Sequence, residues 1–190
     1  MTAAEFRKKS FDKVNCANKP MEMGAYHECL FVNCDFKECS FQNFTFIECK
    51  FIGCDLNNIT IGQAKFEDVE FKDCQMENLK FHNAHVKTFK STFNHCFMNG
   101  ASFREMKLEG QSFLNCILQG ADFTKVDLVD AEFLNCDLRK AIFKETNLKN
   151  TDFRTSYNYT IDLEENKVNG AKFSTNGLAG LLQKFDIEII

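Results

Sequence analysis

The sequence has no tryptophan, a single proline at Pro20, and no apolar stretch of transmembrane length. Proline lacks the backbone N–H that a hydrogen-bond ladder requires, so its scarcity permits an unbroken ladder along most of the chain. The basic residues from Arg7 to Lys9 precede no apolar run, which argues against a signal peptide. We therefore expect a cytoplasmic protein with no membrane segment.

An excess of basic residues is also lacking. The chain carries 27 acidic and 23 basic residues, for a net charge of −4, and the two signs are interspersed. A protein that binds nucleic acid directly needs a basic field that faces the phosphates. The composition argues against direct nucleic-acid binding, and the 190 residues with 44% hydrophobic content suffice for one domain with a real core.

The dominant feature is a large apolar residue, most often phenylalanine, at every fifth position from Phe6 to Phe173. All but four of the 22 phenylalanines fall in this register, which slips by two residues near Phe89. A second inward position lies two residues before each large one and is often held by a small residue, cysteine or alanine. Neither the helical period nor the strand period fits this spacing, so we expect the chain to turn a corner after each short extended piece.

A longer period of 20 residues is superimposed on the five-residue period, because like residues return after every fourth piece, as in Phe31, Phe51 and Phe71. It predicts a square coil with one piece per side, stacked at about 4.8 Å so that like residues form columns. About eight coils would make a rod on the order of 40 Å long. Residues 1–24 form an irregular first coil or cap, because Cys16 and Met21 occupy large-residue positions. The expected core columns are Phe31, Phe51, Phe71, Phe93, Phe113, Phe133 and Phe153, and Cys34, Cys54, Cys74, Cys96, Cys116 and Cys136.

Two runs of residues carry a family resemblance. The segments 121–125 (ADFTK) and 131–135 (AEFLN) resemble the pentapeptide-repeat signature, approximately A-(D/N)-(L/F)-x-x. The resemblance covers about residues 25–175. It implies an all-β solenoid, a right-handed quadrilateral parallel β-helix, over residues 1–173.

The pattern changes after Phe173, and residues 174–190 form a separate capping unit. Ser174 or Thr175 can cap a helix, and residues 186–190 read as a short strand. Such a unit closes the open end of a repeat protein and offers an apolar surface to a second copy. The expected dimer interface is Leu178, Leu181, Leu182, Phe185, Ile187 and Ile189.

The stretch Gly177 to Leu182, with Ile187 and Ile189 behind it, looks like the C-terminal dimerisation module of the quinolone-resistance (Qnr-type) pentapeptide-repeat proteins. That resemblance implies a homodimer that mimics DNA and acts on the type II topoisomerases DNA gyrase and topoisomerase IV. Qnr-type proteins carry two long projecting loops, whereas the internal break here is the slip at residues 87–92. The alternative to a topoisomerase-binding protein is a scaffold that binds a different protein partner.

Charge gives the mimicry hypothesis a local test. A 40 Å length of duplex DNA carries roughly 24 charges, so a net charge of −4 restricts mimicry to a local acidic belt. Its candidate residues are Asp122, Asp127, Asp130, Glu132, Asp137 and Asp152. The alternative is that the turns themselves favour aspartate at these positions.

Phe97 and Ile117 form a second candidate surface. They occupy the same outward position of successive coils, which predicts one apolar spot on an otherwise solvated face. The spot is either a partner contact or a dry area covered by residues 87–92.

No catalytic, metal or cofactor site is expected. The ten cysteines recur as C-x4-C rather than in the spacing of zinc sites, so we expect buried free thiols that fill space, although neighbours in a column would lie within disulfide range. His82 and His85 fall on different sides of a corner and are expected in solvent. No motif for a nucleophile, a phosphate loop or a metalloprotease is present.

Overall fold

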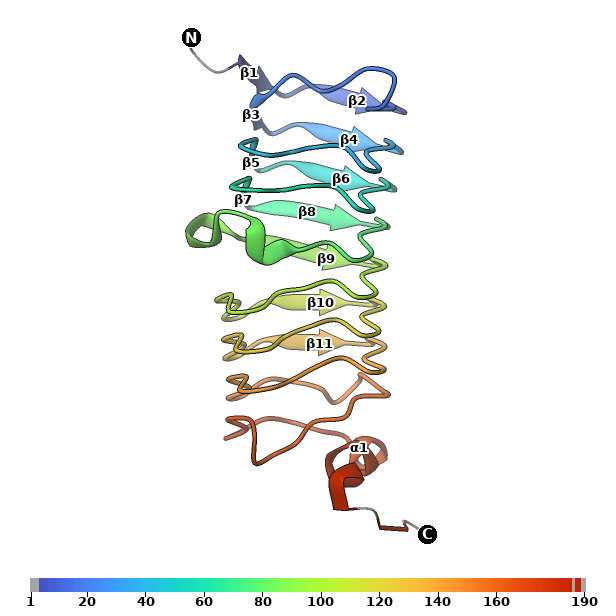
Figure 1. The fold of residues 1–190 in the computed structure, drawn as a ribbon, viewed down its shortest axis with the longest axis vertical. Coiled ribbons are helices and arrows are strands. Elements are labelled where there is room, and N and C mark those ends of the chain that lie inside the picture. The colour runs from blue at the N-terminus through green and yellow to red at the C-terminus, as the bar shows by residue number, and fades with distance from the viewer. Residues whose placement is uncertain (1–3, 186, 189–190) are drawn as a thin grey trace.

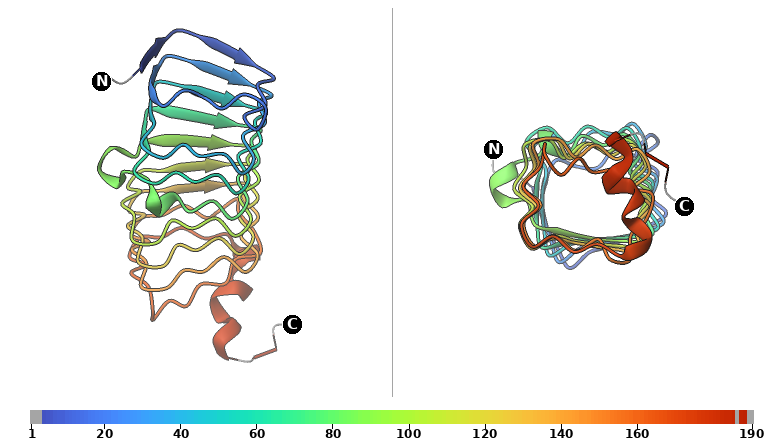
Figure 2. Two further views of the ribbon diagram at one scale, coloured as in Figure 1. Left: turned by 45° about the horizontal axis from the view of Figure 1, so that its top comes forward. Right: turned by 90° about the horizontal axis from the view of Figure 1, so that it is seen from below.

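The chain winds around one axis as a stack of square coils, with its two ends at opposite ends of the rod (Figures 1 and 2). The computed structural model describes residues 4–185 and 187–188. Its strands are β1 Ala4–Arg7, β2 Ser10–Asp12, β3 Gly24–His27, β4 Leu30–Val32, β5 Thr45–Ile47, β6 Lys50–Ile52, β7 Lys65–Glu67, β8 Val69–Lys72, β9 Ser91–Asn94, β10 Ser112–Leu114 and β11 Glu132–Leu134. None of the helices among these residues is long and apolar enough to cross a membrane.

The strands form two parallel sheets on adjacent sides of the square. One has the order β1-β3-β5-β7 and the other β11-β10-β9-β8-β6-β4-β2. Each coil pairs with the next in the predicted register, as Phe31 does with Phe51, which confirms the β-solenoid. The seven strands of the larger sheet mark about six turns, slightly fewer than the eight predicted, and single bridges continue the stacking as far as Lys172.

The corners explain the five-residue period. At most corners the residue two positions after the large one adopts a left-handed conformation, for example Glu28 (φ 51), Asn33 (φ 51) and Glu48 (φ 52). This conformation costs a non-glycine residue roughly 1–2 kcal/mol. Corner amides recover part of that cost by donating to the next coil, as Glu28 N does to Ile47 O at 2.9 Å.

Two kinds of aromatic contact fill the core. Along a column the rings stack, as in Phe113 and Phe133 at 4.9 Å between centroids and 10° between planes. Across a corner they meet edge to face, as in Phe123 and Phe133 at 5.5 Å and 89°. Burial of each such side chain contributes about 2–3 kcal/mol. The predicted phenylalanine column from Phe31 to Phe153 is at most 2% exposed throughout.

The cysteine, serine and threonine side chains at the inward position are hydrogen-bond donors as well as fillers. Cys34 Sγ contacts the carbonyl oxygens of Phe11 and Val32, both at 3.4 Å. Ser156 Oγ donates to Phe133 O at 2.8 Å, in the same relation that joins Cys34 to Phe11. A side chain with a donor at this position therefore satisfies a buried carbonyl in the coil above, which purely apolar packing would leave unpaired.

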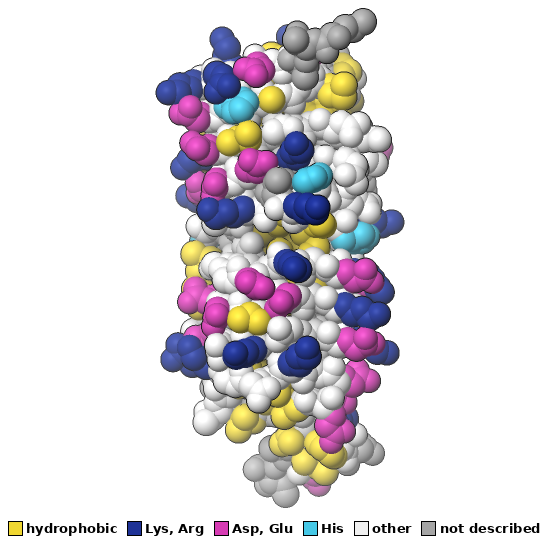
Figure 3. Space-filling model, turned by 90° about the vertical axis from the view of Figure 1, so that its left-hand side faces the viewer, with side chains coloured by type: hydrophobic (Ala, Val, Ile, Leu, Met, Phe, Trp, Pro, Cys, Tyr) yellow, Lys and Arg dark blue, Asp and Glu magenta, His cyan; other side chains and the backbone are white. Residues whose placement is uncertain are grey.

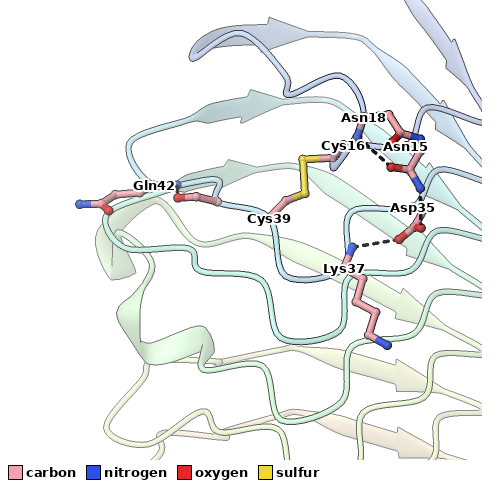
Figure 4. The surroundings of a disulfide bond; sticks show 8 residues. Asn15, Cys16, Asn18, Asp35, Lys37, Cys39 and Gln42 are labelled. Atoms are coloured by element: carbon pink, nitrogen blue, oxygen red, sulfur yellow. Dashed lines mark hydrogen bonds between the residues drawn. A yellow bond between two sulfur atoms is a disulfide. The ribbon is translucent and has the colours of Figure 1, made fainter.

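One cysteine pair departs from the expected free thiols. Cys16 and Cys39 form a disulfide with Cα atoms 6.4 Å apart (Figure 4). Their sequence separation of 23 is the offset that elsewhere brings an inward donor close to the coil above. Because position 16 holds cysteine where most coils hold a large side chain, two sulfur atoms meet there. The other eight cysteines are free and buried, among them the predicted column from Cys34 to Cys136.

The slip becomes a projection at one corner (Figures 1 and 2). Two short 3-10 helices, η1 Phe81–Asn83 and η2 Val86–Thr88, take up the two additional residues. The pairing then resumes with Phe71 opposite Phe93, two positions beyond the regular register. The aromatic column therefore continues through the interruption.

The C-terminal cap is helical. It consists of η3 Thr175–Gly177, α1 Ala179–Leu182 and η4 Gln183–Phe185, and it lies along one side of the square end (Figure 2). Ile161 N donates to Gly180 O at 3.1 Å, which joins the cap to the last coil. Of the predicted terminal strand, Ile187 and Glu188 are not in a strand, and positions 186, 189 and 190 lie outside the described residues.

Candidate interaction surfaces

The described residues contain no group of three or more His, Cys, Asp or Glu side chains arranged to hold a metal ion. The candidate sites that the sequence predicts are surfaces. Three follow from the sequence: the C-terminal end, the acidic belt, and the outward apolar column that contains Phe97.

The C-terminal end exposes apolar side chains close together in sequence. Leu178 is 47% exposed, and Phe185 and Ile187 are each 55% exposed. Figure 3 shows hydrophobic side chains gathered at this end of the rod. A hollow of about 580 Å³ beside them is lined by Arg139, Asn158, Tyr159, Thr160, Ala179, Gly180, Leu182, Gln183 and Ile187. The arrangement offers both a projecting apolar group and a recess.

Three residues of the predicted dimer interface need separate mention. Leu181 is buried within the monomer and belongs to the core cluster, so its surface assignment is wrong. Its burial follows from its position on the inner side of α1. The next element, η4, is held to the last coil by Lys184 Nζ, which lies 2.8 Å from Asp162 and 2.7 Å from Glu164. Ile189 lies outside the described residues, and Leu182 is half-buried.

The acidic belt is distributed over the sides of the square, and several of its carboxylates hold the coil together. Asp122 accepts the Thr124 amide at 2.9 Å and pairs with Arg104 at 3.0 Å. An aspartate that accepts the amide two residues ahead is a turn-forming residue. This arrangement favours the turn explanation for Asp122 over a role in mimicry.

The neighbouring members of the belt are bound to the coil to different degrees. Asp127 accepts a hydrogen bond from Asn147 Nδ2 at 2.9 Å, and Asp130 accepts one from Asn150 Nδ2 at 2.9 Å. Glu132 remains exposed. Some carboxylates of the belt therefore bond one coil to the next, and only some are free to contact a partner.

Asp137 and Asp152 are buried rather than displayed. Each is 7% exposed. Burial alone raises the pKa of Asp137, but hydrogen bonds from Asn158 and Gln119 outweigh it and hold that pKa below the ordinary value. Hydrogen bonds from Arg154 lower the pKa of Asp152 in the same direction. Both carboxylates are thus charged and internally paired, which makes them poor contacts for a partner.

The Phe97 column is open to solvent. Backbone bridges align Phe97, Ile117, Asp137 and Tyr157 along one side of the rod. Phe97 is 46% and Tyr157 50% exposed, and Ile117 is half-buried. The slip segment therefore does not cover Phe97. Sequence reasoning missed Tyr157, although its place in the repeat, two coils after Ile117, was a usable signal.

Comparison with known proteins gives a family match. A family model described as a pentapeptide repeat region matches residues 25–103 and 86–173. A search of curated proteins finds no match. Among solved structures, the trypsin-treated QnrB1, described as a plasmid-mediated fluoroquinolone resistance protein, is 18% identical with a TM-score of 0.47, covering 98% of this chain and 100% of that one. HetL, described as involved in heterocyst differentiation regulation from the cyanobacterium Nostoc, is 13% identical with a TM-score of 0.35, covering 90% and 86%.

Proposed function

The chain belongs to the pentapeptide-repeat family, and from that premise we propose that it is a non-enzymatic interaction protein that dimerises through its C-terminal end and binds a type II topoisomerase. The observation that carries the proposal is the exposure of Leu178, Phe185 and Ile187 beside a recess at that end. Apolar groups of this kind on a rod end favour contact with another protein surface.

A second copy is the occupant proposed for the C-terminal end. A twofold contact places the same patch on both subunits, so a projecting Phe185 of one copy can enter the recess of the other. The test is light scattering on Phe185→Asp and Leu178→Asp. Both should shift the protein toward monomer, whereas Val86→Asp, which alters an equally exposed residue on the slip segment, should not. A monomeric parent protein, or unchanged dimers in both variants, would overturn this step.

The topoisomerase partner rests on the C-terminal resemblance and on the rod shape. The exposed carboxylates of the belt are few, so a complex of this kind would rely on shape and local charge more than on overall potential. The test is a gyrase supercoiling assay with and without a fluoroquinolone. The expected result is inhibition of supercoiling, or relief of the drug effect, at micromolar protein. No change in either arm refutes the partner.

The Phe97 column favours a second candidate, a scaffold for a different protein. A partner that covers Phe97, which is 46% exposed, would remove an apolar ring from water and so gain binding free energy. Affinity capture with the parent protein and with Phe97→Glu discriminates the two functions. Recovery of a partner other than a topoisomerase, lost in Phe97→Glu and kept in Val86→Asp, supports the scaffold.

A further inference from the structure

The backbone ladder is interrupted on one side of the first coil. In the third coil, Thr60 N donates to Cys39 O in the coil above at 3.0 Å. The equivalent amide of the second coil belongs to Ser40, and among the described residues it makes no such bond to Lys19. Within the same part of the chain, no bridge joins residues 17–23 to the second coil, whereas Ser40 is bridged to Thr60. Backbone pairing therefore does not hold residues 17–23 to the coil below.

A disulfide takes the place of that pairing. Residues 17–23 form most of the arch that joins β2 to β3 at the N-terminal end of the rod (Figure 1). The ladder ends at Cys16, whose N donates to Asp35 O at 2.9 Å, and the bond from Cys16 to Cys39 then ties the start of the arch to the second coil (Figure 4). At the other end of the arch, Tyr26 Oη donates to Glu22 O at 2.7 Å.

Solvent reaches one sulfur of the pair more readily than the other. Cys39 is half-buried, whereas Cys16 is 7% exposed. The other eight cysteines are free thiols, each at most 1% exposed. A thiol in solution attacks only a sulfur that it can reach, so exchange selects the accessible position. Cys39 is therefore the point of entry for thiol chemistry in this chain.

The repeat explains why Cys39 is accessible. In the next two coils its column continues with Ile59 and Leu79, which are buried. One coil above Cys39, the same column holds Lys19, which is exposed and so adds no apolar cover. Cys39 is thus the last inward residue of its column and has a smaller side chain than the two below it.

We propose that Cys39 is a reversible S-thiolation site, at which a small thiol of the glutathione class opens the disulfide and releases residues 17–23. The thiolate attacks Cys39 Sγ and forms a mixed disulfide with it. The bond from Cys39 to Cys16 breaks, and Cys16 Sγ leaves with the electron pair and takes up a proton from solvent. Attack of the Cys16 thiolate on Cys39 Sγ reverses the step and returns the small thiol.

The first test identifies the sulfur that is attacked. Reduced glutathione at millimolar concentration is added to the full chain, samples are quenched with N-ethylmaleimide at successive times, and peptides are mapped by mass spectrometry. The first product should carry glutathione on Cys39 and maleimide on Cys16, and the eight buried thiols should be labelled only after unfolding. Glutathione mainly on Cys16, no adduct on either sulfur, or a chain without the disulfide before treatment overturns the proposal.

Two matched variants compare the sulfurs one at a time. Cys16→Ser leaves Cys39 as a single thiol, Cys39→Ser leaves Cys16, and each is treated with oxidised glutathione. Cys16→Ser should form the mixed disulfide about tenfold faster than Cys39→Ser, because access to the sulfur limits the exchange. Equal rates in the two variants would contradict the assignment of Cys39.

A glutamyl protease measures the release of the arch, because Glu22 is exposed within it. Cleavage tracks the population of the open form, so glutathione should accelerate cleavage after Glu22 in the parent by up to about a hundredfold. Cys16→Ser should be cleaved rapidly there without glutathione. Cleavage after Glu109, an exposed residue of an inner coil, should stay unchanged. Unaltered cleavage after Glu22 in both proteins refutes the release.

Discussion

Reduction of the Cys16–Cys39 disulfide should loosen a defined part of the rod. The bond closes a loop with a sequence separation of 23, which contains β3 and β4 but not β1 and β2. A closed loop of this length stabilises the folded state by about 3 kcal/mol through the restricted unfolded chain. In a stack of coils each unit contacts only its neighbours, so the loss is confined to the N-terminal coils.

The expected size of the effect follows from that free energy. A loss of about 3 kcal/mol raises the population of the locally opened loop by roughly a hundredfold. The amides of Glu28 and Asn33, which donate to the third coil, should exchange faster by about this factor after reduction. The amides of Lys8 and Lys13 should change much less, because β1 and β2 can separate from the end without opening the loop.

Hydrogen exchange with and without reductant measures both regions in one experiment. Cys39→Ser should reproduce the reduced state, and Cys96→Ser, which alters a free buried thiol, should leave residues 17–35 unaffected in both conditions. Intact mass provides the check on the bond, since reduction adds two hydrogen masses. Equal exchange of residues 17–35 in the two states, or no change in mass, would refute the reasoning.

Three further predictions concern stability and charge. Phe123→Ala removes a fully buried ring between Phe103 and Phe143 and should lower the unfolding free energy by about 3–5 kcal/mol in denaturant titrations. Because the pKa of Asp137 is lowered in the fold, its stabilisation is present above about pH 4 and lost as pH falls through the folded pKa; Asp137→Asn should flatten stability against pH there. Asp122→Asn keeps the acceptor for the Thr124 amide, so its unfolding free energy should stay within about 1 kcal/mol of the parent's while the variant reports on partner binding.

Much of the fold could be predicted because the pattern for each side of the coil occurs several times in the sequence. A residue such as Phe113 occurs in a column with equivalent neighbours above and below, so one register fixes them together. The corners and the two-residue slip followed from the same spacing. The disulfide did not, because it depends on a relation between adjacent coils. The offset between Cys16 and Cys39 exceeds one full turn of the coil by three positions. The contact between Cys34 and Phe11 has the same offset, and it shows that such residues lie close together in adjacent coils.

The candidate surfaces were harder to predict because the position of a residue in the repeat does not show whether its side chain is exposed or bonded within the coil. Asp122 and Glu132 occupy equivalent positions, yet the first pairs with Arg104 and the second is exposed. Leu178 and Leu181 both suit an apolar helix face, but α1 turns Leu181 toward the core. Which side of so short a helix is buried depends on its docking against the last coil. Local pattern alone does not encode that docking.

The middle coils of the rod use most of their backbone groups in bonds between coils. In the middle coils, a backbone group meets its partner in the coil above or below, and inward donors such as Cys34 take up further carbonyls. An outward side chain there has only its own surface to offer. A partner of the middle coils therefore contacts outward side chains such as Phe97 and Glu132 rather than backbone groups.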